Sequence, residues 1–436
     1  MILNMLIFIK YWLILEFINW LTYLYIYMNV ASPKFMKMKE KDTYNIIKRI
    51  DKLSKDEIEY VIKGCIIYDK YNHKNVDNDC FNLKDLSKTE LIHLIGYSLF
   101  ALNKIDIYYS KKYSLIIYII NKIQEKIGFT FCDNTNDRYI YRKWGSTFFK
   151  FSFRPLIIQI LIRIIVFIVH YSFIFGLGFK YNQINKIGFL YNISNPNKKN
   201  LFFIHGFGFG YIPYIKVLYE LSKQYNLIIV VLPNISSYSY YDDLNYAYFP
   251  PIELLKNTIY DFFQSNNLNE VLLLAHSFGT YITQILRNDE RQHIFKKIVM
   301  VDPIIFWISH FKMSLHVDNP FIQKKPLIKY LSDNFINFLI YQCLYLKYVC
   351  FRVMFGPDYW IYNIKEIIDS NISFILEKGD YIIPAELLYK KINNRVKCLY
   401  YDNDSITHGT VVVEKKYAKD IINLLEESII YTKKVF

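Results

Sequence analysis

The stretch VLLLAHSFG, residues 271–279, decides the fold of this chain. Its first half is a short, uninterrupted apolar run, which is typical of a strand buried on both faces. Its second half is a turn with Ser277 at the apex, and Ala275 and Gly279 on either side are small enough for a strand and a helix to approach closely. The stretch therefore predicts a strand-turn-helix unit that presents the Ser277 hydroxyl. A plain strand-helix connection without a chemical role is the alternative.

Further apolar runs and helical segments continue this pattern along the second half of the chain. The apolar runs lie at 201–204, 227–232, 298–301, 373–376 and 396–400, and the helical segments at 211–225, 251–265, 279–289, 384–392 and 412–429. This alternation predicts an α/β domain with a mostly parallel sheet. In such sheets the chemistry-bearing residues gather at the carboxyl ends of the strands.

Candidate catalytic residues follow three of these strands. Asp380 comes after the run 373–376, and His408 lies in the loop after the run 396–400. A serine hydroxyl is a weak nucleophile until a base removes its proton, and the base needs an acid that orients it. The chain order Ser277, Asp380, His408 supplies these three groups.

Other residues are open alternatives for the same roles. Asp302 directly follows another of the apolar runs, 298–301, and competes with Asp380 as the acid, although a proline follows it at once. His205, His276 and His293 are alternative bases in principle. Each candidate alone also fits a structural role, so the prediction rests on their joint occurrence after strands.

Five short motifs carry a resemblance to a known superfamily. They are HGFGFG at 205–210, AHSFG at 275–279, VDP at 301–303, GDYIIP at 379–384 and THG at 407–409. With these motifs the sequence resembles the α/β-hydrolase superfamily of serine-hydrolase type. With Arg154-Pro155-Leu156, the Leu-Gly-Phe at 177–179 and Trp360, it is most similar to eukaryotic membrane-associated hydrolase-like proteins of unassigned substrate. The resemblance implies the α/β-hydrolase fold, a mostly parallel central sheet flanked by helices.

The resemblance also implies roles for five residues. Ser277 would be the nucleophile, His408 the base and Asp380 the acid that orients the base. The backbone amides of Phe207 and Phe278 would form the oxyanion hole. A serine at the apex argues against the dehalogenases and epoxide hydrolases of this fold, which carry an aspartate nucleophile.

Composition bounds the remaining possibilities. The 436 residues are 53% hydrophobic and 21% charged, which excludes a disordered or low-complexity chain. The net charge of +14 comes from lysines that are spread along the sequence, so we expect no nucleic-acid partner. Six cysteines without CxxC pairs or metal-ligand spacing predict neither a structural metal site nor a disulfide framework, and slightly favour a reducing compartment. The resemblance to serine hydrolases implies no cofactor.

Residues 1–30 are apolar over more than the roughly 20 residues that cross a bilayer, which predicts an N-terminal membrane anchor. Lys10, Glu16 and Asn19 interrupt the run, so an interfacial or buried helix and a cleaved signal are the alternatives. Lysines at 34, 37, 39 and 41 then place the hydrolase domain on the cytoplasmic side.

A second apolar segment, residues 156–175, carries Gln159, Arg163 and His170 on one helical face. This narrow polar stripe must meet headgroups, a partner or the protein interior. We therefore favour a helix that lies on the membrane or is buried over one that spans it.

The chain is thus divided into four parts. We expect an anchor at 1–30, a helical accessory region at 31–150, a hydrophobic helical segment at 151–184 and an α/β-hydrolase domain at 185–432 with a cap insertion at about 304–370. Within the accessory region, 46–71 and 87–102 have helical periodicity, and Ser87 with Glu90 forms a capping-box pattern.

The resemblance and the aromatic cap imply a serine hydrolase, an esterase or lipase-like enzyme that cleaves a lipid or other apolar acyl ester through an acyl-enzyme. A catalytically silent binding or scaffold protein at a membrane and an acyltransferase are the alternatives. The oligomeric state is not predicted.

Overall fold

The computed structural model describes residues 2–30, 47–48, 50–51, 53–69, 74–75, 81–100, 102, 104–133, 138–141, 153–232, 235, 249–306 and 371–427. The expected cap at 304–370 lies outside the described residues except for its first three, and Trp360 lies outside with it. The lysines at 34, 37, 39 and 41 are also outside, so the cytoplasmic placement that they favour stays a prediction.

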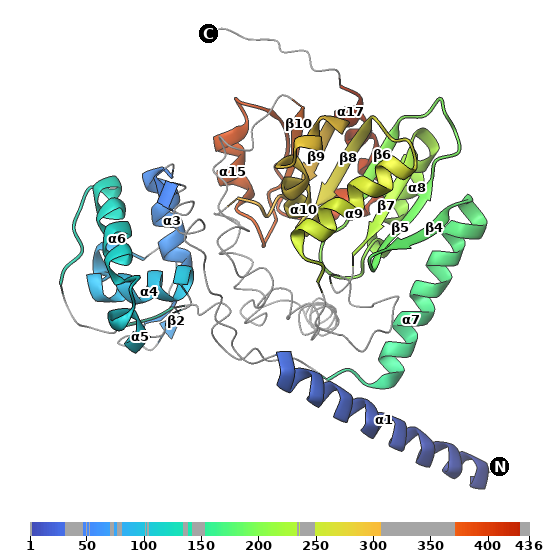
Figure 1. Cartoon of the computed structure of the whole chain (residues 1–436), viewed down its shortest axis with the longest axis horizontal. Helices are drawn as coiled ribbons and strands as arrows, with labels where there is room; N and C mark the ends of the chain where they lie inside the picture. The colour runs from blue at the N-terminus through green and yellow to red at the C-terminus, as the bar shows by residue number, and fades with distance from the viewer. Residues whose placement is uncertain are drawn as a thin grey trace.

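A sheet of eight strands forms the centre of the second half of the chain (Figure 1). Its spatial order is β11-β10-β9-β8-β6-β7-β5-β4. The strands are β4 (Lys180–Ile184), β5 (Ile187–Asn192), β6 (Asn200–Ile204), β7 (Asn226–Val231), β8 (Val271–His276), β9 (Phe295–Val301), β10 (Ile372–Glu377) and β11 (Lys397–Tyr401). Strands β4 and β5 pair antiparallel, β5 also pairs antiparallel with β7, and all other pairings are parallel. This arrangement is the α/β-hydrolase fold, so the predicted fold class is confirmed.

Helices cover both faces of the sheet, which explains the uninterrupted apolar strands. On one face α9 (Ile252–Ser265), α10 (Phe278–Arg287) and α15 (Ala385–Ile392) pack in one core cluster with Phe202 and Ile204 of β6. On the other face α8 (Ile215–Gln224), α16 (Thr410–Val413) and α17 (Ala418–Glu426) pack with Leu201 and Phe203 of the same strand. Successive side chains of β6 thus enter opposite cores, as strand geometry requires. Short 3-10 turns lie at η3 (Ile212–Tyr214), η4 (Glu290–Ile294) and η6 (Lys415–Tyr417).

All six predicted strands are present, but β4 and β5 were not predicted. The edge strand β4 has the sequence KYNQI, whose polar residues give no apolar run. The two strands are joined through Asn185 and Lys186, which both have positive φ (50° and 65°) in a tight turn without the usual glycine. The sheet consequently begins at Lys180, ahead of residue 185 where the sequence predicted its domain to start.

The accessory region has a core of its own, built from helices and a small antiparallel sheet. The helices are α3 (Lys55–Cys65), η1 (Leu83–Asp85), α4 (Lys88–Phe100), α5 (Lys104–Tyr109) and α6 (Tyr113–Ile127), and the strands are β1 (Ile66–Asp69), β2 (Lys74–Asn75) and β3 (Tyr139–Tyr141). The predicted helix at 46–71 is wrong over β1, because that segment pairs with β3, which is distant in sequence. The capping box is confirmed: the Ser87 N–H donates to Glu90 Oε2 at 2.9 Å and the Glu90 N–H donates to Ser87 Oγ at 3.1 Å.

Two further helices, α1 (Ile2–Val30) and α7 (Leu156–Tyr171), are apolar along most of their length. A π-helical turn, η2 (Ser172–Gly176), extends α7, and its Phe173 belongs to the core that also holds α8. Among the described residues α1 and the extended α7 are the two helices long and apolar enough to cross a membrane. Figure 1 shows α1 beside the start of α7. There the Leu156 N–H donates to Glu16 Oε1 at 2.8 Å, and Gln159 donates to Asn19 Oδ1 at 3.0 Å. The carboxylate of Glu16 therefore caps the positive end of the α7 dipole.

The close packing of α10 on β6 yields a first prediction. A Cβ atom on Gly279 would lie 2.3 Å from the Ile204 carbonyl oxygen, so Gly279→Ala must displace the helix. We expect a loss of about 3 kcal/mol of unfolding free energy, as for overpacked cores, measured by urea unfolding in detergent. Gly176→Ala is the control, since nothing lies within 4 Å of its added Cβ. Equal unfolding midpoints for the two variants would contradict the close approach.

Candidate active site

Ser277 occupies a strained turn between β8 and α10. Its backbone has φ 51° and ψ −116°, a conformation that L-residues rarely adopt and that costs about 1–3 kcal/mol. The Ser277 N–H donates to the Val301 carbonyl at 3.0 Å, and Thr280 Oγ1 donates to the Ser277 carbonyl at 2.6 Å. These bonds, with the close approach at Gly279, hold the serine at the carboxyl end of β8.

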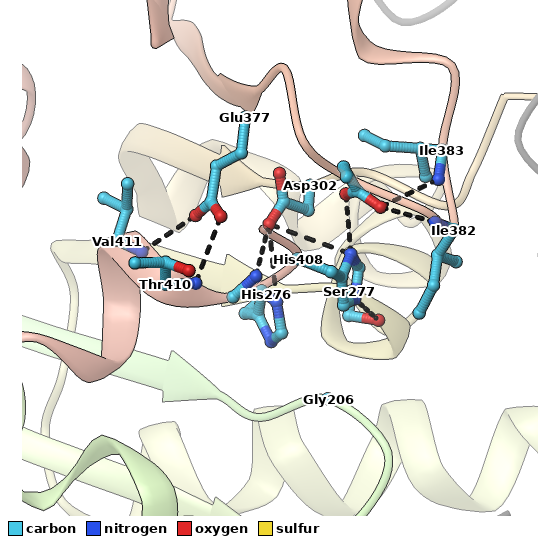
Figure 2. Close-up of polar contacts among 12 residues, drawn as sticks. Gly206, His276, Ser277, Asp302, Glu377, Ile382, Ile383, His408, Thr410 and Val411 are labelled. Atoms are coloured by element: carbon cyan, nitrogen blue, oxygen red, sulfur yellow. Dashed lines mark hydrogen bonds and ion pairs between the residues drawn. The ribbon is translucent and has the colours of Figure 1, made fainter. Parts of the chain in front are cut away.

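The structure brings Ser277, His408 and Asp380 together through two consecutive contacts, and Figure 2 shows Ser277 next to His408. Ser277 Oγ lies 2.9 Å from His408 Nε2, and His408 Nδ1 lies 2.7 Å from Asp380 Oδ2. The other Asp380 oxygen accepts the N–H groups of Ile382 at 2.6 Å and Ile383 at 3.0 Å. A neutral His408 in this arrangement donates Nδ1–H to Asp380 and leaves Nε2 free to accept the serine proton.

The surroundings of His408 increase its basicity. Burial lowers the pKa of the imidazole, but the charge of Asp380 and its hydrogen bond outweigh burial and leave the pKa raised. The imidazolium form that a transferred proton would create is therefore stabilised where it forms.

Phe207 and Phe278 lie next to each other beside the serine, with ring centroids 4.4 Å apart. The loop that carries Phe207 is held close, since a Cβ on Gly206 would meet Ser277 Cβ at 2.9 Å. Within the described part of the chain, neither backbone N–H donates to a carbonyl. The Phe278 amide also lies at the N-terminus of α10, where the helix dipole favours negative charge.

The alternative acid and bases are placed differently. Asp302 Oδ2 is 3.8 Å from His408 Nδ1, beyond hydrogen-bonding distance and farther than Asp380. His205 Nδ1 contacts the Gly206 carbonyl at 2.8 Å, and burial lowers its pKa to about 4. His276 Nδ1 contacts Tyr214 Oη at 2.8 Å, and His293 lies in the exposed turn η4.

Two residues of this neighbourhood were missed by sequence reasoning. Tyr214 Oη accepts the Gly206 N–H at 3.1 Å and contacts His276, so it connects the loop before Phe207 to the residue before Ser277. Glu377 is buried at the end of β10, where its carboxyl accepts the N–H groups of Thr410 and Val411. A glutamate that ends an apolar strand was the available signal for Glu377, while nothing in the sequence marked Tyr214.

One group of potential metal ligands is present among the described residues, namely His276, Asp302 and His408, with their ligand atoms within 4.8 Å of one another. His408 Nδ1 is bonded to Asp380, and Asp302 Oδ2 accepts the Gly409 N–H at 2.8 Å. These atoms already serve the hydrogen-bond network of the site, and we assign no metal to them.

No family model and no curated protein matches this chain. Solved structures of esterases, a putative lipase and other hydrolases are similar to it. A serine hydrolase from Cycloclasticus zankles has 15% identity and a TM-score of 0.40 over 56% of this chain and 96% of its own. A bacterial membrane phospholipase A has 12% identity and a TM-score of 0.42 over 62% and 96%. A carboxylesterase from Bacillus subtilis has 10% identity and a TM-score of 0.43 over 57% and 91%. The fold assignment rests on the strand order of the chain itself.

The strain at Ser277 can be measured with two variants that both lack the hydroxyl. We expect Ser277→Gly to be more stable than Ser277→Ala by about 1 kcal/mol, because glycine adopts positive φ without a Cβ clash. Urea unfolding compares the two. The same pair at Ser222 within α8 is the control, where alanine is expected to be the more stable residue. Equal unfolding free energies for Ser277→Gly and Ser277→Ala would contradict a strained backbone at residue 277.

Proposed function

We propose that this protein is a serine hydrolase that cleaves carboxylic esters through Ser277, His408 and Asp380. The supporting observation is the continuous contact from the serine hydroxyl through the imidazole to the buried carboxylate, at 2.9 and 2.7 Å. The strained turn supports the same reading, since strain of this kind gathers at functional sites.

In the proposed reaction Ser277 Oγ attacks the ester carbonyl while His408 Nε2 takes its proton. The negative charge that forms on the carbonyl oxygen is stabilised by the amides of Phe207 and Phe278, each donor contributing about 3 kcal/mol. His408 then gives the proton to the leaving alkoxide, and an acyl-enzyme remains on Ser277. Water repeats the sequence with His408 as the base, which releases the acid and restores the serine.

Asp380 has two tasks in this scheme. Through the Nδ1 contact it fixes the tautomer that leaves Nε2 as the acceptor, and its charge stabilises the imidazolium. The raised pKa of His408 agrees with a base that must hold a proton briefly before it passes the proton on.

We further propose a lipid or other apolar acyl ester as the substrate and a membrane as the place of action. The face of α7 that packs on the protein joins Ile162 and Val166 to Phe209 and Ile212, in the segment that follows Phe207. On the same face His170 Nδ1 contacts Tyr211 Oη at 3.1 Å.

The opposite face of α7 is apolar and exposed, through Ile164, Ile165, Phe167 and Ile168. A helix that packs on the protein with one face and exposes an apolar second face is suited to lie in the membrane surface. A helix that spans the bilayer alone would instead expose apolar side chains to lipid on all its faces. We therefore propose that α1 anchors the chain and that α7 lies in the headgroup region next to the catalytic loop.

A fluorophosphonate, which phosphonylates activated serines, tests the catalytic assignment. We expect the wild type to react, Ser277→Ala and His408→Ala to lose the reaction, and Asp380→Asn to slow it by about 10⁴-fold because the wrong tautomer is held. Labelling rates of detergent-solubilised protein provide the measurement. His293→Ala, on the exposed turn η4, is the matched control and should react like the wild type. A folded wild type that does not react would favour a binding protein without turnover.

The placement of α7 is tested by adding a tryptophan at Phe167, which is 57% exposed. In phosphatidylcholine vesicles we expect the added emission to be quenched more by nitroxides near the glycerol backbone than by nitroxides at the chain ends. Tyr219→Trp on α8, which is 44% exposed, is the control and should remain unquenched. Stronger quenching by the deep nitroxides would mean that α7 spans the bilayer, and no quenching at 167 would place it in water.

A further inference from the structure

Three buried carboxyl groups lie near one another at the strand ends that carry the site, and the proposed mechanism uses one of them. Asp302 and Glu377 are completely buried and Asp380 is 2% exposed. Figure 2 shows Asp302 between Glu377 and His408. Within the described part of the chain no lysine or arginine pairs with Asp302 or Glu377. A buried carboxyl group without a cation is expected to be neutral, because burial disfavours its charged form.

The contacts of Asp302 show how one charge is removed. Its Oδ2 accepts the Gly409 N–H at 2.8 Å, while its Oδ1 is buried and has no donor among the described residues. Its carboxyl group lies beside that of Asp380, since Asp302 Oδ2 and Asp380 Oδ2 face the same nitrogen, His408 Nδ1, at 3.8 and 2.7 Å. Two carboxylates are both acceptors, so a hydrogen bond between them requires that one keeps its proton.

The distribution of donors decides which of the two keeps it. Asp380 accepts the N–H groups of Ile382, Ile383 and His408, whereas among the described residues Asp302 accepts the N–H of Gly409. Donors stabilise the ionised form, so Asp380 is the better anion. Burial, and then the charge of Asp380, raise the pKa of Asp302 well above its ordinary value, in agreement with this assignment.

The remaining titratable groups that face Asp302 do not compensate a charge on it. These groups are His408, Asp380, Glu377, His276 and Tyr214. Burial lowers the pKa of His276 well below its usual range, so this imidazole is neutral although its Nε2 lies 3.7 Å from Asp302. Burial raises the pKa of Glu377 to about 10 and also raises that of Tyr214, which leaves both neutral. The imidazolium of His408, formed during turnover, is the one cation in this set.

We propose that Asp302 is a positioning residue whose protonated carboxyl group donates a hydrogen bond to Asp380 and thereby holds Asp380 ionised and aligned with His408. This inference rests on the proposed function of the three residues. The pair carries one negative charge in place of two, so His408 is basic enough to take the serine proton without retaining it against the leaving group. Asp302 has φ 47°, a conformation rare for non-glycine residues, which agrees with a side chain held in one direction.

The pH dependence of fluorophosphonate labelling tests this role with Asp302→Asn and Asp302→Ala. In the wild type the rate should fall as the pH falls through the raised pKa of His408, above 6.5. Asparagine keeps a neutral donor, so we expect a rate within about threefold of the wild type and the same midpoint. Alanine removes the donor, and misalignment of this kind costs about 10²-fold. A midpoint lowered by about one pH unit or more in Asp302→Asn would show that a negative charge had been lost and would overturn the proposal.

A second measurement needs neither activity nor a variant. In the wild type with ¹³C-labelled aspartate, a protonated carboxyl group gives an infrared C=O stretch that a carboxylate lacks, and the isotope shift separates it from Glu377. We expect this aspartic acid band at neutral pH, and its absence would refute the protonated pair. If the band is present but the wild type is not labelled, the proposed function fails while the protonated pair stands.

Discussion

The close approach of α10 to β6 is the constraint on which the site depends. Gly279 leaves no room for a side chain against the Ile204 carbonyl, and this contact turns the chain sharply enough to place Ser277 above the sheet. The same edge receives Asp380 from the turn after β10 and His408 from the loop after β11. The residues meet because parallel strands present their carboxyl ends together, so the sheet order determines which distant segments become neighbours.

Sequence reasoning was most successful where one physical signal dominated. Buried strands have uninterrupted apolar runs, which made β6 to β11 visible, and the small residues around Ser277 marked the turn. It failed where a partner distant in sequence decides the structure, as for β1, and where an edge strand such as β4 carries polar residues on an exposed surface. The candidate triad could be selected because its members follow strands in order. The hydrogen bonds around the triad could not be predicted in this way, since the contact between Asp302 and Gly409 joins residues 107 positions apart.

The polar residues of the two apolar helices have structural explanations that a hydropathy profile does not contain. Glu16 and Asn19 interrupt an otherwise lipid-like helix, yet they serve the N-terminus of α7 and its Gln159. His170, at the other end of α7, contacts Tyr211 rather than solvent. Arg163, which the sequence placed on the same polar stripe, has an exposed side chain. The predicted stripe is thus divided among three different environments.

Two residues with positive φ, Ser277 and Asp302, lie at the ends of the neighbouring strands β8 and β9. Conformations of this kind draw on the stability that the surrounding core provides. Directed evolution for heat resistance alone would therefore first replace Ser277 and Asp302 by residues that tolerate positive φ, such as glycine. The arrangement of side chains at the carboxyl ends of these strands would then be lost. A selection intended to preserve the site has to score the serine's reactivity together with the melting temperature.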